Sequence, residues 1–166
     1  MWKKLGERPL YDGYRRIVGR TYETPEGTQE LEIKVEGPTA VTLALTPARE
    51  IVLVREFRPG VEEWLLELPG GSVDDGEAPA EAARRELLEE TGYAGELRPA
   101  GSMVDCAYST RIRHVFVVEN ARRIGEPAEL LETVLVGLQE FREHLRGGRL
   151  TDVGPGYLAL DALNLL

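Results

Sequence analysis

The chain has 166 residues, enough for one ordinary domain that buries a core without disulfides or a structural metal. The formal net charge of -9, with no basic run longer than Arg122-Arg123, excludes a broad binding surface for nucleic acid. The single cysteine, Cys106, excludes an internal disulfide and a cysteine zinc cluster.

Neither a membrane anchor nor an export signal is evident. No apolar run reaches the roughly 20 residues that span a bilayer, and the charged start MWKKLGERPL lacks the apolar stretch of a signal peptide. We therefore expect a cytoplasmic protein with no membrane partner.

The first part of the chain has a β pattern. Tyr14–Tyr22 and Thr28–Val35 favour strands, and the turn residues Thr24-Pro25-Glu26-Gly27 between them predict an N-terminal hairpin. Short apolar runs then predict three core strands, the last of which ends at Pro69-Gly70-Gly71. These runs are Val41–Leu45, Ile51–Arg55 and Trp64–Leu68.

The clearest helix is predicted over Pro79–Thr91, with proline in its first turn and Gly92 at its end. Beyond it the pattern predicts three further strands and two further helices, which together indicate an α+β fold with a mixed sheet. The strands are Leu97–Val104, His114–Val118 and Thr133–Val136, and the helices are Leu138–Arg146 and Pro155–Leu166.

Three carboxylates crowd one face of the predicted helix. Glu86, Glu89 and Glu90 stand at positions i, i+3 and i+4, where like charges repel by roughly 0.2 to 0.5 kcal/mol per pair. They also lie toward the C-terminal half of the helix, where the helix dipole disfavours anions. The arrangement indicates a bound cation, and oxygen-only ligands favour Mg²⁺, with Mn²⁺ as a substitute.

The segment that carries these carboxylates, GSVDDGEAPAEAARRELLEETGY, resembles the signature box of the Nudix hydrolase family. Every fixed position of the box is filled, and seven matches at about 7% each would arise by chance about once in 10⁸ windows. Tyr93 stands where the family usually has an aliphatic residue. The matching residues are Gly71, Glu77, Arg85, Glu86, Glu89, Glu90 and Gly92.

The resemblance implies a mixed sheet sandwiched between helices, with the box forming a loop, helix and loop that hold metal ions. It implies that Glu86 and Glu90 bind metal directly, that Glu89 shares the cluster, and that the backbone carbonyl of Gly70 completes the coordination. Arg85 is implied to orient these carboxylates through ion pairs, together with Glu77.

Further features resemble the ADP-ribose and nucleotide-sugar pyrophosphatase branch of the family. They are the N-terminal hairpin, the segment VREFRPGVE and the segment WLLELPGG that leads into the box. Within the second feature, Glu56 and Arg58 match a substrate-binding signature, and a guanidinium suits phosphate or ribose oxygens. The branch implies a homodimer formed through the hairpin, so we expect a dimerisation extension over residues 1–40 and a catalytic domain over residues 41–166.

Two loops carry further candidate residues. Glu129 matches a glutamate on a loop that closes over the substrate, although Glu126 and the box glutamates stay alternatives as the catalytic base. The second loop, Asp105–Thr110, lacks the proline and glycine that ADP-ribose pyrophosphatases usually carry there. Its Tyr108 is a candidate for stacking on a base or sugar.

The function expected from these residues is metal-dependent hydrolysis of a nucleoside diphosphate joined to a sugar, giving a nucleoside monophosphate and a sugar phosphate. The missing proline and glycine weaken the case for ADP-ribose itself and favour other nucleotide sugars or related dinucleotides. The alternatives are a non-catalytic nucleotide sensor and a hydrolase of nucleotides, dinucleotide polyphosphates or RNA 5′ ends. The intact box weighs against a sensor, because a sensor has little reason to retain all three glutamates.

Overall fold

The computed structural model describes residues 1–166, which form two compact units. The first unit comprises Met1–Pro38 together with Val104–Ile112, and the second comprises Thr39–Met103 together with Arg113–Leu166. No helix of the structure is long and apolar enough to cross a membrane. The division expected at residue 40 stays a prediction.

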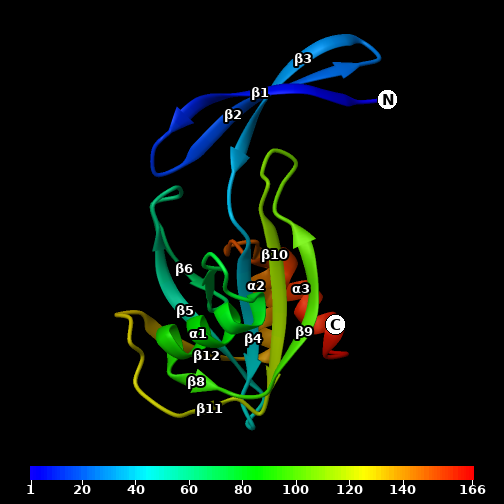
Figure 1. The fold of residues 1–166 in the computed structure, drawn as a ribbon. Helices are drawn as coiled ribbons and strands as arrows, with labels where there is room; N and C mark the ends of the chain where they lie inside the picture. The colour runs from blue at the N-terminus through cyan, green and yellow to red at the C-terminus, as the bar shows by residue number, and fades with distance from the viewer. The chain divides into compact units, whose positions relative to one another are not determined.

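The first unit contains a three-stranded antiparallel sheet in the order β1-β2-β3 (Figure 1). Its strands are β1 (Lys3–Asp12), β2 (Arg16–Thr24) and β3 (Gly27–Val35). The β2–β3 hairpin agrees with the sequence pattern, and the Thr24 hydroxyl donates a hydrogen bond to the Gly27 carbonyl across its turn at 2.8 Å.

A second segment of the first unit, Val104–Ile112, is attached to the end of β3. The Lys34 N–H donates to the Tyr108 carbonyl at 2.8 Å, and the Thr110 N–H donates back to the Lys34 carbonyl at 3.0 Å. The carboxylate of Glu36 accepts hydrogen bonds from Ser109 at 2.8 Å and from Arg111 at 3.1 Å. Residues more than 70 positions apart therefore form one unit.

The second unit is built on a seven-stranded mixed sheet. Its main path runs β12-β5-β4-β10-β9, with β6 paired to β5 and β7 paired to β4. β4 and β10 are parallel, whereas β5 is antiparallel to β4, β6 and β12. The strands are β4 (Thr39–Leu45), β5 (Glu50–Arg58), β6 (Glu63–Glu67), β7 (Gly70–Ser72), β9 (Leu97–Val104), β10 (Ile112–Glu119) and β12 (Glu132–Gly137).

Helices cover both faces of this sheet (Figure 1). Alternate residues of β4 belong to different core clusters: Leu43 packs with residues of α2 (Leu138–Gly147) and α3 (Val153–Ala162), and Ala44 packs with Leu87 of α1 (Pro79–Thr91). Because a strand buried on both faces has no polar side, the central strands read as unbroken apolar runs. The small side chains of Ala40, Ala82 and Ala83 pack together where α1 meets the sheet.

The last helix differs from the sequence expectation, which extended it over Pro155–Leu166. It begins at Val153 and ends at Ala162, because Asn164 adopts a left-handed conformation with φ 55°. The Asn164 N–H donates to the Asp161 carbonyl at 2.9 Å and the Leu165 N–H to the Leu160 carbonyl at 2.8 Å. This pair of bonds is a Schellman motif, which satisfies the last carbonyls and stops the helix.

The expected fold class is confirmed: a mixed sheet lies between helices and is preceded by an antiparallel N-terminal sheet. Three short elements were not anticipated, namely β7 and the two-residue strands β8 (Tyr93–Ala94) and β11 (Arg122–Arg123), which pair with each other. β1 was not anticipated either.

Candidate active site

Helix α1 carries the carboxylates that the sequence singled out. Glu86 and Glu90 are buried, and Glu89 is half-buried. The helix is well defined at both ends: Glu81 accepts a hydrogen bond from the Ala78 N–H at 3.0 Å, and the left-handed Gly92 donates to the Leu88 carbonyl at 2.8 Å. Fixed ends hold the three carboxylates in register.

Arg85 binds the carboxylates around it with its whole guanidinium group. Its Nε and Nη2 donate to the two oxygens of Glu77, each at 3.0 Å, and its Nη1 donates to Glu86 at 2.7 Å and to Glu89 at 3.3 Å. These bonds, first those to Glu77 and Glu86, raise the pKa of Arg85. A planar fork with five donors suits this role, and the compact ammonium of a lysine would not fill it.

The two glycines of β7 lie at close approaches, Gly70 to the backbone of β4 and Gly71 to a side chain of α1. A Cβ on Gly71 would lie 2.4 Å from a carboxylate oxygen of Glu86, and one on Gly70 would lie 2.4 Å from the Ala40 carbonyl oxygen. The Gly70 N–H donates to the Glu90 carboxylate at 2.9 Å. The backbone of β7 therefore lies directly against two of the three carboxylates.

Glu129 reaches the same site from a distant loop. The N–H groups of Ala128 and Glu129 both donate to the Glu89 carbonyl, at 2.7 and 3.0 Å. As a result, carboxylate oxygens of Glu86, Glu89 and Glu129 lie within 4.8 Å of one another. Glu126 instead forms an exposed ion pair with Arg123 at 2.6 Å.

The electrostatics of the site oppose the accumulation of negative charge. Burial raises the pKa of Glu90 to about 8; the Gly70 hydrogen bond opposes this shift, and the charges of Glu86 and Glu129 add to it. Burial also raises the pKa of Glu86, against the effect of its bond to Arg85. Without a cation, Glu90 therefore holds a proton at neutral pH.

The donor set fits a hard divalent cation. Every side chain that the structure brings together here offers carboxylate oxygen, and no histidine or cysteine belongs to the group. The oxygens converge from two directions, because Glu86 and Glu89 come from α1 and Glu129 from the loop before β12. Glu90, which the sequence expectation made a direct ligand, lies beside this group and is bonded to Gly70.

Arg58 and Glu56 are residues of β5, and they lie near the carboxylate cluster of α1. The Arg58 Nη1 donates to Glu56 at 2.8 Å, and its Nε donates to Glu67 at 3.3 Å. Burial raises the pKa of Glu56, with further contributions from the charges of Glu67 and Glu129. Tyr108 belongs to the first unit, so its contact with a substrate stays a prediction.

Sequence reasoning missed two residues of this region, Glu67 and Thr151. Glu67 is fully buried, and Thr151 donates to its carboxylate from 84 positions away. A glutamate inside the apolar segment WLLELPGG was a detectable signal, since glutamate is almost never fully buried without a partner. The identity of that partner was not detectable, because it depends on the tertiary fold.

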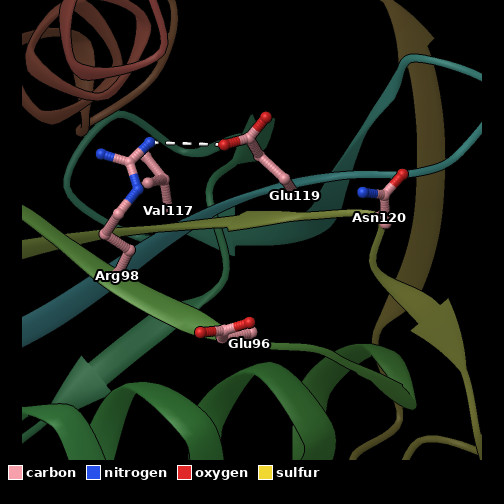
Figure 2. Close-up of a pocket in the computed structure, with 5 residues that line it drawn as sticks. All are labelled: Glu96, Arg98, Val117, Glu119 and Asn120. Atoms are coloured by element: carbon pink, nitrogen blue, oxygen red, sulfur yellow. Dashed lines mark hydrogen bonds and ion pairs between the residues drawn. The ribbon is translucent and has the colours of Figure 1, made fainter.

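A separate hollow of about 330 Å³ lies beside β9 and β10 and contains none of the predicted site residues (Figure 2). Arg98 and Glu119, which line it, form an ion pair at 3.4 Å, and both side chains are about half exposed. Figure 2 shows these two side chains turned toward each other. None of the three carboxylates that converge beside α1 lines this hollow, so the carboxylate cluster is the better candidate active site.

Together, the mixed sheet between helices and the carboxylate cluster on α1 define an α+β protein with a candidate site for a divalent cation. Comparison with known proteins narrows this class. The model of the NUDIX domain matches residues 36–151, and the chain belongs to the Nudix hydrolase family.

Three comparisons place the chain more closely. It is 32% identical to CMP-5'-(N-acetyl-N-hydroxy-3-aminopropyl)phosphonate hydrolase of Streptomyces rubellomurinus, over 99% of this chain and 83% of that protein. It is 34% identical to an ADP-ribose pyrophosphatase of Bacillus subtilis, over 71% of this chain and 65% of that protein. A crystal structure of an ADP compounds hydrolase has the same fold, with a TM-score of 0.79 over 99% of this chain and 97% of the other, at 19% identity. The resemblance to the ADP-ribose and nucleotide-sugar pyrophosphatase branch is thereby confirmed.

Proposed function

We propose that the chain is a Mg²⁺-dependent pyrophosphohydrolase that cleaves a nucleoside diphosphate joined to a sugar, giving a nucleoside monophosphate and a sugar phosphate. The observation that carries this proposal is the convergence of Glu86, Glu89 and Glu129 within 4.8 Å, beside the buried Glu90. Four carboxylates at one place are costly without a cation, and a cation shared with a diphosphate makes that place a hydrolytic site.

The residues of the chain divide the work of the reaction. Glu86, Glu89, Glu90 and the Gly70 carbonyl would hold Mg²⁺ or Mn²⁺, and the bound cation would polarise the diphosphate and neutralise the charge on the leaving phosphate. Arg85 fixes the orientation of Glu86 and Glu89 through its bonds at 2.7 and 3.3 Å. These contacts preorganise the site, so little rearrangement accompanies the reaction.

Glu129 is the residue we assign to the attacking water. Its side chain is exposed, and its backbone is held to α1 by the bond to the Glu89 carbonyl at 3.0 Å. In the proposed step the carboxylate of Glu129 accepts a proton as the water oxygen bonds to phosphorus. The bond from phosphorus to the bridging oxygen then breaks, and the leaving phosphate carries away the electron pair.

The substrate is expected to contact Arg58, whose guanidinium suits phosphate or ribose oxygens. A nucleotide sugar is supported by the pyrophosphatases of Bacillus subtilis and Mus musculus, which are 34% and 36% identical to the chain. A second candidate is a nucleoside monophosphate joined to a phosphonate, which the name of the Streptomyces relative indicates. That candidate is favoured by a match over 99% of this chain and by the absence of proline and glycine in Asp105–Thr110.

The test is turnover on a panel of compounds, followed by release of phosphate from the products with a phosphomonoesterase. The panel contains ADP-ribose, ADP-glucose, GDP-mannose, UDP-glucose, a CMP-phosphonate, diadenosine polyphosphates and deoxynucleoside triphosphates. Each compound is assayed with Mg²⁺, with Mn²⁺ and with a chelator. Selective, metal-dependent cleavage of a nucleotide sugar supports the proposal, whereas tight binding without turnover would favour a nucleotide sensor.

A further inference from the structure

Glu67 is a charged residue in the core of the second unit that the proposed reaction does not use. It lies at the end of β6 and is fully buried, with a relative exposure of 0%. Removing a carboxylate from water costs several kcal/mol, and an apolar side chain of similar size usually serves stability as well or better. Its presence therefore indicates a purpose other than stability.

The carboxylate of Glu67 is fully engaged by hydrogen-bond donors. The Thr151 N–H donates to its two oxygens at 2.8 and 3.1 Å, and the Thr151 hydroxyl donates to one of them at 2.9 Å. The Nε of Arg58 also donates to the carboxylate at 3.3 Å, and the buried side chain of Asp152 is a further hydrogen-bond partner. One side of the carboxylate is thus fixed by the segment before α3, and the other side faces Arg58.

The strand register explains why these two side chains meet. β5 and β6 are antiparallel, with Arg58 opposite Glu63 and Val54 opposite Glu67, so Arg58 and Glu67 lie on the same face four residues apart. At about 3.3 Å per residue this offset is about 13 Å, which only two extended side chains can bridge. Arg58 is therefore drawn back along the strand, away from the exposed turn.

The Arg58 guanidinium also bonds Glu56, a carboxylate of the same strand. Its Nη1 donates to Glu56 at 2.8 Å, and the Glu56 carboxylate is close enough to Glu129 for the charge of Glu129 to raise the pKa of Glu56. A buried carboxylate and a site carboxylate thus hold opposite edges of one planar cation. This arrangement fixes both the position and the plane of the guanidinium.

The segment that supports Glu67 is itself anchored. Arg149 forms an ion pair with Glu63 on the same strand, and Asp152 forms one with Arg113 of β10. His144 makes a further hydrogen bond to the Leu66 carbonyl at 2.9 Å. The donors that orient Glu67 therefore come from a segment fixed at several points.

We infer that Glu67 is a positioning residue, which holds the Arg58 guanidinium through Nε and so fixes the plane in which that group meets the phosphate or ribose oxygens of a nucleoside diphosphate. This inference rests on the proposed function, because it assumes that Arg58 contacts that substrate. It adds a residue that touches neither substrate nor metal and acts on the substrate through Arg58. A change at Glu67 should therefore weaken binding of substrate more than it slows the chemical step.

The test is a double-mutant cycle between Glu67→Gln and Arg58→Ala, measured with the nucleotide sugar that the panel identifies. Glu67→Gln is expected to raise KM about tenfold and to change kcat by less than about threefold. In the Arg58→Ala background the same change should alter KM less than about twofold. The matched control is Glu132→Gln, because Glu132 also pairs with an arginine of β5, Arg55, at 3.3 Å.

A milder variant covers the case in which Glu67→Gln does not fold. Thr151→Val removes the hydroxyl donor at 2.9 Å and keeps the backbone N–H, and it should raise KM in the same direction by a smaller factor. Thermal unfolding of each variant shows whether the fold is retained. Glu67→Gln could raise KM by the same factor with and without Arg58, or it could impair kcat and KM by the same factor. Either result would assign Glu67 a structural role alone and overturn the inference.

Failure of the proposed function would be recognised separately. If the wild-type chain hydrolyses no compound of the panel, the same cycle is measured by calorimetry with ADP and Mg²⁺. Coupling between Glu67 and Arg58 in ADP affinity would then support the inference although the reaction had been wrongly assigned. Absence of coupling, or of ADP binding by the wild-type chain, would overturn it.

Discussion

If the α1 carboxylates hold a cation as proposed, Glu90 should link the binding of that metal to pH. Its pKa is raised to about 8 by burial, so the metal-free site is protonated below that pH and must lose a proton when a cation binds. The affinity for Mn²⁺ should therefore fall about tenfold for each pH unit below 8 and level off above it. Calorimetry at pH 6, 7 and 8 in buffers of different ionisation enthalpy measures both affinity and proton release. An affinity that does not change with pH would contradict this expectation.

The same shift determines how stability depends on pH without metal. Between the ordinary pKa of 4.5 and the folded value of about 8, the folded state binds more protons than the unfolded state. The contribution of Glu90 to stability is therefore greatest at low pH and decreases as the pH rises through this range. A bound cation should reverse the trend, because it favours the ionised carboxylate.

Gly71 offers a test of the close approach between β7 and α1. A Cβ at this position would lie 2.4 Å from the Glu86 carboxylate oxygen, which is the flexible end of a side chain. Gly71→Ala should therefore displace the carboxylate with little cost to the fold. We expect turnover to fall at least about tenfold while the unfolding temperature changes by only a few degrees. Unchanged turnover would show that this approach does not position Glu86.

At the end of helix α1, Gly92 differs from Gly71 because backbone, and not a side chain, would meet a Cβ added there. Its φ is 73°, and a Cβ would lie 2.2 Å from the Gly125 carbonyl oxygen, which belongs to the backbone and cannot rotate away. Gly92→Ala should lower the free energy of unfolding by at least about 2 kcal/mol. Urea unfolding monitored by circular dichroism measures the change. A loss under 0.5 kcal/mol, on the order of a neutral surface substitution, would contradict the assigned helix end.

A helix or strand could be predicted from the sequence when the residues that cause it lie within the element itself. Helix α1 was predicted with its observed bounds, Pro79–Thr91, because its proline, its periodicity and its glycine end are all local signals. β7 is only Gly70–Ser72, and no propensity favours a strand in Gly-Gly-Ser; it pairs because the fold brings it beside β4. β1 was missed because its residues are almost all exposed and lack alternation, and its pairing with β2 has two register shifts.

The residues of the candidate site also divide into those that a local sequence pattern predicted and those whose contacts depend on the tertiary fold. The box glutamates were predicted as a group because they share one face of one helix, and the match of the box placed Arg85 among them. Glu129 was predicted only through resemblance, and its approach depends on the loop bonds to the Glu89 carbonyl. Glu67 and Thr151 meet across 84 positions, so no local pattern indicates their contact.

At the scale of the whole molecule, the N-terminal sheet supports the expectation of a homodimer. The buried hydrophobic residues of β1–β3 are only Val18 and Ile33, whereas Trp2, Leu5 and Tyr11 are exposed. A three-stranded sheet with so small a core would gain stability from a further apolar surface, and a second copy would provide one. Light scattering after gel filtration should give twice the mass of one chain, and a mass equal to one chain would contradict the dimer.

We propose that the carboxylates of α1 carry out metal-dependent hydrolysis, and the magnesium dependence of turnover in Glu90→Gln tests this assignment most directly. Glutamine resembles the protonated Glu90 of the metal-free site, so the fold and the bond to the Gly70 N–H should be retained. We expect kcat to fall by about 10² or more and the magnesium needed for half-maximal turnover to rise. Near-normal turnover at unchanged magnesium demand in a folded variant would contradict the assignment of this cluster as the active site.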